Sequence, residues 1–189
     1  MVLPVVKYGH PVLRQKGARI DKITPAIHSL IENMIETMRD ARGVGLAAQQ
    51  IGQALQLTVL DVSNIDDRPS TLKIKGQTVE IKDFMPMVLI NPEIKSMNEP
   101  VSGPEGCLSF PEIYADITRP ESVDVRAVDQ KGQWLEFTAG GLLGRAIQHE
   151  ADHLNGILFI DRMPRAVKEE LRESLEELQA DTKKALKKG

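Results

Sequence analysis

The sequence predicts an α+β domain, and three observations support this. The expected elements come in the order helix, strands, helices, without the strict strand–helix alternation of a parallel α/β fold. Two polar turns between alternating apolar segments are typical of β-hairpins, which build antiparallel sheets. The chain has 189 residues, which suits one hydrophobic core because domains usually hold about 100–200 residues.

The first expected helix begins after Thr24 and ends by Gly43. Threonine is a preferred N-cap residue, and Pro25 suits the first helical position, where its missing N–H is not needed. Apolar residues then recur at helical spacing, which predicts one buried face. They are Ile27, Leu30, Ile31, Met34, Ile35 and Met38.

Strands are expected in the middle of the chain. Residues 56–62 form a strand candidate, and residues 87–91 indicate a buried strand that ends at Pro92, because proline cannot donate to a strand ladder. Residues 71–82 alternate on both sides of Gly76-Gln77, which predicts a hairpin.

The second hairpin and the remaining helices follow. Residues 122–128 and 133–137 flank the turn signal Asp129-Gln-Lys-Gly132. A helix is expected over about residues 142–154, with Gly156 near its C-terminal cap. A last helix is expected from about Arg165 into the tail.

Composition narrows the classes of partner. Lysine and arginine number 24 against 27 aspartate and glutamate, a formal charge of −3, whereas duplex-binding domains are usually strongly basic. No apolar run approaches the roughly 20 residues of a membrane span, and residues 1–8 do not resemble a secretory signal. The single cysteine, Cys107, cannot form an internal disulfide. We therefore expect a cytoplasmic protein with no membrane and no DNA partner.

His149-Glu150-Ala151-Asp152-His153 is the sharpest chemical signal. Residues four apart project from one face of a helix, so both imidazoles can bind one metal ion. Glu150 is then placed to accept a proton from a water molecule that the ion activates. The alternative is a surface helix that carries two unrelated histidines. His10 and His28 are expected to have no catalytic role.

A catalytic ion usually needs a third protein ligand. A metzincin protease would place a histidine at position 159, but Phe159 stands there. A thermolysin-like enzyme would use a downstream glutamate such as Glu173, which belongs to an acidic run typical of a solvated helix face. Cys107 is the better candidate, on a tight turn expected over residues 103–109. Alternatively, Cys107 is a small hydrophobic residue buried in the core.

Three segments together resemble the signature motifs of peptide deformylases, in the family's order. They are Gly43-Val-Gly-Leu-Ala-Ala-Gln-Gln-Ile-Gly52, Glu105-Gly-Cys-Leu-Ser109 and Gln148-His-Glu-Ala-Asp-His153. The resemblance implies removal of the formyl group from the N-terminal formyl-methionine of newly synthesised polypeptides. It also implies a catalytic domain at residues 1–165, an insertion at 71–82, and a charged C-terminal helix or tail at 166–189. The implied fold packs the motif helix against antiparallel strands.

The resemblance further implies roles for individual residues. It implies one divalent ion, Fe²⁺ in the cell, with Zn²⁺, Ni²⁺ or Co²⁺ as substitutes in purified samples. The implied ligands are Cys107, His149 and His153. The side-chain amide of Gln50 and the backbone N–H of Leu108 would bind the oxyanion. The residues implied for substrate binding are Val44, Gly45, Leu142 and Ala146.

Two other functions fit the residue pattern. A general metalloprotease would cleave unformylated peptide bonds and would depend on Glu173. A non-catalytic metal-binding module would use the ion only to hold the fold together. The four lysines of the tail, after six acidic residues, could complement a helix dipole or contact ribosomal RNA. They are Lys183, Lys184, Lys187 and Lys188.

Overall fold

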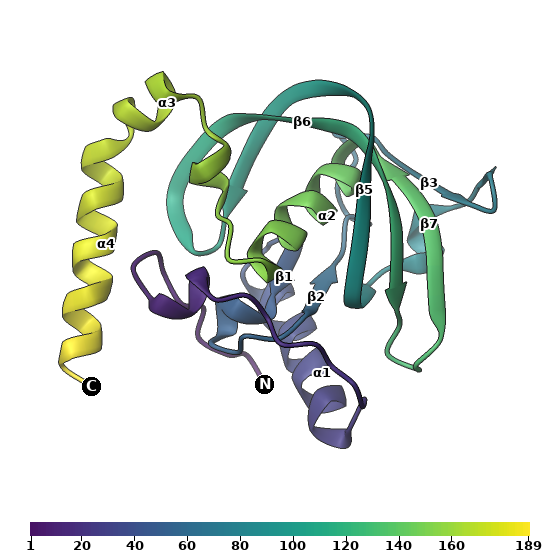
Figure 1. Cartoon of the computed structure of the whole chain (residues 1–189), viewed down its shortest axis with the longest axis horizontal. Helices are drawn as coiled ribbons and strands as arrows, with labels where there is room; N and C mark the ends of the chain where they lie inside the picture. The colour runs from purple at the N-terminus through teal and green to yellow at the C-terminus, as the bar shows by residue number, and fades with distance from the viewer.

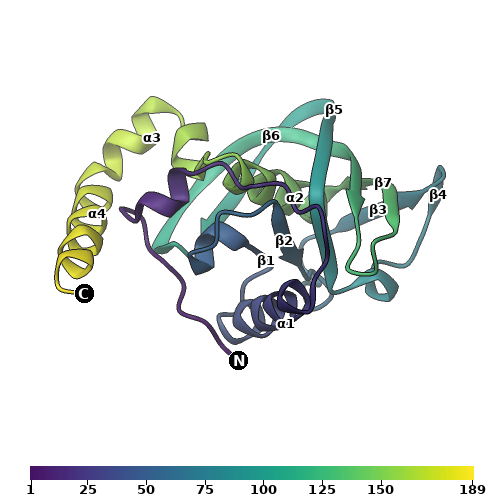
Figure 2. The same cartoon turned by 60° about the horizontal axis from the view of Figure 1, so that its bottom comes forward.

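The structure is a computed structural model that describes all 189 residues, and it confirms an α+β fold with an antiparallel sheet. Helix α2 (Gly141–Leu154) lies inside a strongly curved sheet, and α1 (Pro25–Asp40) packs outside it (Figure 1). Helices α3 (Arg165–Glu170) and α4 (Arg172–Lys187) lie together at one end. In both views the β3–β4 hairpin lies at the opposite end (Figure 2).

Seven strands form one sheet in the order β1-β2-β5-β6-β7-β3-β4, with every pairing antiparallel. Their bounds are Gly45–Ala47 (β1), Leu57–Leu60 (β2), Ser70–Ile74 (β3), Gln77–Thr78 (β4), Met87–Cys107 (β5), Phe110–Val128 (β6) and Trp134–Gly140 (β7). The long strands β5 and β6 bend over α2, and three register shifts along their pairing supply local bends. Because β1 pairs only with β2, one edge of β1 stays open.

The prediction that Pro92 ends a strand was wrong. Strand β5 continues through Pro92 to Cys107. The pairing with β6 shifts register between Ile90 and Glu93, and Asn91 has a positive φ of 51°. Proline is tolerated at such an irregularity because the ladder needs no donor there.

The first hairpin was predicted only in part. Strands β3 and β4 turn at Lys75 and Gly76, one residue earlier than expected, and β4 has only two residues. Ile81 begins a short 3-10 helix, η3 (Ile81–Phe84), instead of continuing the strand. The hairpin extends the sheet through pairing of β3 with β7. The second hairpin is confirmed, with Asp129 N–H donating to the Gln133 carbonyl at 2.9 Å.

Helix α1 has the predicted start, since the Thr24 hydroxyl accepts from the Ile27 N–H at 3.3 Å. Ile31, Met34 and Met38 on its expected face are fully buried. Gly156 follows α2 with a φ of +73°, as expected near a helix C-terminus. The expected last helix is divided into α3 and α4 at Leu171. Three further 3-10 helices are η1 (Pro11–Arg14), η2 (Ala48–Ile51) and η4 (Phe159–Arg162).

Helix α2 is enclosed on all sides, and every residue from Leu142 to Leu154 is buried. Such a helix is usually apolar throughout, but α2 carries histidine, glutamate, aspartate and arginine. Buried polar side chains usually pair with partners inside the fold, and those that do not point to a group from outside the chain. None of the α-helices combines the length and apolar composition that crossing a bilayer requires.

Candidate metal centre and its cleft

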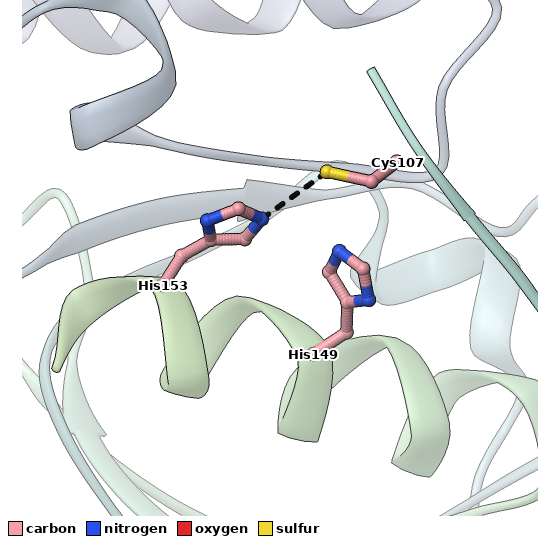
Figure 3. Close-up of side chains that lie close together, drawn as sticks. All are labelled: Cys107, His149 and His153. Atoms are coloured by element: carbon pink, nitrogen blue, oxygen red, sulfur yellow. Dashed lines mark hydrogen bonds between the residues drawn. The ribbon is translucent and has the colours of Figure 1, made fainter. Parts of the chain in front are cut away.

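Three candidate ligands come together from two elements. His149 and His153 lie one helical turn apart on α2, and Cys107 ends β5 above them (Figure 3). One side-chain ligand atom from each residue can be chosen so that all three lie within 4.8 Å of one another. The Sγ of Cys107 is 3.4 Å from Nε2 of His153. The structure therefore brings together the three residues expected to bind the ion.

Cys107 is positioned by the end of β5. The predicted turn over residues 103–109 was too long, because residues 103–107 are extended and pair with β6. Only Leu108 and Ser109 turn the chain, between Cys107 and its partner Phe110. Gly106 lets the exposed Tyr114 side chain pack across β5, since a Cβ at that position would lie 2.6 Å from the Tyr114 ring. The register of the β5–β6 pairing therefore places the thiol over α2.

The hydrogen bond of His149 and the protonation state of His153 suit metal ligands. Nδ1 of His149 lies 2.9 Å from Glu105 Oε1, which leaves Nε2 for an ion, as is usual for metal-binding histidines. Burial and the charge of His149 lower the pKa of His153 well below 6.5, so its imidazole is neutral. Nδ1 of His153 is buried without a hydrogen-bond partner in the protein. This donor set of two imidazoles and one thiolate is typical of transition-metal sites.

Glu150 faces the same space from α2. The residue is 4% exposed, and its Oε2 atom has no hydrogen-bond partner in the protein. Burial raises its pKa to about 7, a value suited to taking and giving a proton near neutral pH. A Cβ on Gly45 would lie 2.7 Å from Glu150 Oε1, so glycine lets β1 approach this carboxylate closely.

Gln50 has a fixed orientation toward the candidate metal centre. Its Oε1 accepts from the Ala47 N–H at 2.9 Å. Its Nε2 consequently points the other way, 3.2 Å from the Ser109 hydroxyl and 3.5 Å from Cys107 Sγ. The side-chain N–H donor is thus held beside the thiol.

A cleft of about 570 Å³ opens onto this centre. Cys107, His149 and Glu150 line it, whereas His153 is not among its lining residues. It is also lined by all the residues expected to bind the oxyanion or the substrate: Val44, Gly45, Gln50, Leu108, Leu142 and Ala146. No residue of the 71–82 hairpin lines this cleft.

A buried ionic network behind His149 was not predicted. Arg119 donates through Nε to Glu105 at 2.7 Å and through Nη1 to Asp152 at 2.9 Å. Burial alone would raise the pKa of Glu105, but hydrogen bonds from His149 and Arg119 lower it to about 2. Arg145 also donates to Glu105, at 2.9 Å. The network joins the strand that carries Cys107 to the helix that carries His153.

The alternative ligand and the remaining histidines lie outside this centre. Glu173 is exposed on α4 and does not belong to the cysteine–histidine group. Phe159 is buried in the core. His10 accepts from the Val12 N–H at 3.1 Å and caps η1.

Comparison with known proteins gives a consistent result. The sequence model of a family described as polypeptide deformylase matches residues 2–169. The peptide deformylase of Methylacidiphilum infernorum is 43% identical, over 94% of this chain and 93% of the relative. That of Opitutus terrae is 42% identical over 99% and 98%. A crystal structure of the Synechococcus elongatus peptide deformylase with actinonin matches with a TM-score of 0.77 and 38% identity, over 93% and 85%.

Proposed function

The chain belongs to the peptide deformylase family, and from this membership we propose how its residues carry out the reaction. The protein is a metal-dependent hydrolase that removes the N-formyl group from formyl-methionine at the start of newly synthesised polypeptides. The observation that best supports these residue roles is that Cys107, His149 and His153 converge at a cleft that Glu150 also lines.

Cys107, His149 and His153 are proposed as the ligands of one divalent ion. When bound, the ion supplies Lewis-acid activation of water and of the formyl carbonyl. Iron(II) is the proposed ion, from the resemblance to the family, with Zn²⁺, Ni²⁺ or Co²⁺ able to replace it. The donor set does not distinguish these metals, because intrinsic affinities follow a general order in which Zn²⁺ exceeds Fe²⁺.

Glu150 is proposed as the general base and acid. Its carboxylate takes a proton from the attacking water, and the same carboxyl then protonates the departing amine, which leaves formate and a free methionine N-terminus. Gln50 Nε2 and the Leu108 N–H donate to the oxyanion that forms at the formyl oxygen when the formyl carbon is attacked. Removing one such donor typically costs about 3–4 kcal/mol of transition-state stabilisation.

The open edge of β1 is proposed to bind the substrate backbone. An extended peptide can pair with Val44 and Gly45 as an added strand, because β1 has only one strand neighbour. The methionine side chain would occupy the apolar part of the cleft beside Val44, Leu142 and Ala146.

The comparisons do not support the protease alternative. Substituting its expected ligand, Glu173, and the proposed ligand, Cys107, distinguishes the two functions by experiment. In Fe²⁺-loaded protein purified without oxygen, Cys107→Ser is expected to lose most bound metal and formate release from a formyl-Met peptide, because a hydroxyl is a poor ligand for this ion. Glu173→Ala should keep both within about twofold, because surface substitutions rarely perturb a fold. Metal analysis and a formate assay check both variants. The ligand assignment would be contradicted if Glu173→Ala lost its metal while Cys107→Ser kept it.

Residues 1–165 are proposed as the catalytic domain and residues 166–189 as an appended helical segment. The segment is anchored by apolar contacts of Val167, Leu171, Leu175 and Leu178 with the core. Its four C-terminal lysines are exposed. The cytoplasm is the proposed compartment because nascent chains are the substrate.

We further propose that the exposed lysines bind ribosomal RNA, because they can neutralise phosphates near the point where nascent chains emerge. Deleting residues 183–189 is expected to reduce co-sedimentation with ribosomes at low salt. It should leave turnover of a free formyl-Met peptide unchanged, since the deletion lies outside the cleft. Undiminished co-sedimentation would show that the tail is not the contact.

A further inference from the structure

The cleft carries an excess of positive charge in a protein whose formal charge is −3. The lysines, arginines and glutamates that line it are Lys7, Arg42, Arg68, Arg145, Glu105, Glu112 and Glu150. Arg145 and Glu105 neutralise each other at 2.9 Å, and Glu150 faces the reacting centre. The remaining charged groups are three cations, from Lys7, Arg42 and Arg68, and one carboxylate, from Glu112. Unpaired positive charge in a cleft raises the local concentration of negatively charged ligands.

Two of these cations lack the carboxylate partner that most arginines in this chain have. Eight of the eleven arginines form ion pairs. The exceptions are Arg42, Arg68 and Arg165, and the first two line the cleft. Arg68 donates only to the Pro104 carbonyl, at 3.1 Å. Both guanidinium groups therefore keep donors for an acceptor that comes from outside the chain.

Their places in the fold set them along the path proposed for the substrate. Arg42 lies two residues before Val44, which with Gly45 is proposed to pair with the substrate backbone. Arg68 reaches the cleft from the loop before β3 and contacts β5 one residue before Glu105. Lys7 is less free, because its Nζ donates to the Leu108 carbonyl at 3.1 Å.

We propose that Arg42 and Arg68 make this enzyme favour formyl-methionyl chains with acidic side chains at the second and third residues. The inference rests on the deformylase activity and concerns its selectivity. Carboxylates at these positions lie beyond the methionine and can meet the two free guanidinium groups. Because such pairs form before the chemical step and persist through it, the preference acts on KM more than on kcat.

Three C-terminally amidated peptides test the preference without a terminal carboxylate: formyl-Met-Glu-Glu-Ala, formyl-Met-Gln-Gln-Ala and formyl-Met-Lys-Lys-Ala. For the Fe²⁺ enzyme at low salt we expect kcat/KM to be about three- to tenfold higher for the Glu peptide than for the nearly isosteric Gln peptide, which is the size expected of two exposed ion pairs. The Lys peptide should be the poorest substrate. Added salt should reduce the differences.

The variant Arg42→Gln/Arg68→Gln is expected to bring the Glu-to-Gln ratio close to one. The matched control Arg165→Gln/Lys188→Gln removes the same net charge outside the cleft and should keep the wild-type ratio. A wild-type ratio of one or less would overturn the inference, as would an equal loss of preference in both double variants. No turnover of the Gln peptide by wild type would instead count against the activity itself.

Discussion

Replacing Glu150 by glutamine is expected to lower kcat for formate release by about 10²–10⁴-fold, the usual contribution of one general acid–base group. Glutamine has nearly the shape of glutamate but cannot accept a proton at neutral pH. It therefore removes proton transfer and leaves the cleft otherwise filled. The proposed ligands Cys107, His149 and His153 are untouched, so bound metal should stay at one ion per chain. A formate assay beside metal analysis separates these effects.

The same substitution should not destabilise the fold. A buried ionised carboxylate with an unpartnered oxygen carries a desolvation cost, and Oε2 of Glu150 is such an atom. We expect the free energy of unfolding of Glu150→Gln, measured in urea, to equal or exceed that of the wild type. Stability gained where activity is lost is a common feature of active sites.

Glu176→Gln is the matched control for Glu150→Gln, because it makes the same chemical change at an exposed position on α4. Both kcat and stability should match the wild type. If Glu150→Gln kept wild-type kcat with a full complement of metal, the proton would have to move through another group.

Local signals explain which elements could be predicted. The start of α1 depends on Thr24 and Pro25, which act on their own neighbours, and the prediction was confirmed. The path of β5 through Pro92 depends on pairing with β6, about 35 residues further on. A window of a few residues does not contain that information, so the strand was predicted to be too short.

The same distinction holds for the candidate site. His149 and His153 are one helical turn apart, so helical spacing alone places them together. Spacing alone did not decide whether Cys107 is a metal ligand or a small buried residue, because its position over α2 depends on the long β5–β6 hairpin. Arg119 was missed for the same reason. It occupies an inward position of β6 in line with Ile113 and Ile117, and an arginine in such an apolar row is a usable signal of a buried partner.

Arg119→Met is expected to lower the free energy of unfolding by about 3–5 kcal/mol, the usual cost of breaking a buried ionic network by removing one member. Arg119 is only 4% exposed and contacts both Glu105 and Asp152. Methionine fills part of the volume but leaves these carboxylates without their shared cation. Urea unfolding of metal-free protein measures this cost without a contribution from the ion.

Arg162→Met is the matched control, because Arg162 also pairs with Asp152, at 2.9 Å, but its side chain is 47% exposed. Solvent screens such a pair, so its loss should cost no more than about 1 kcal/mol.

Arg119→Met should in addition weaken Co²⁺ binding, since Glu105 lies two residues before Cys107 and Asp152 directly precedes His153. Equal destabilisation by the two variants would mean that the cost follows the shared contact to Asp152. In that case the link that Arg119 makes between Glu105 on β5 and Asp152 on α2 would not be what holds the proposed ligands together.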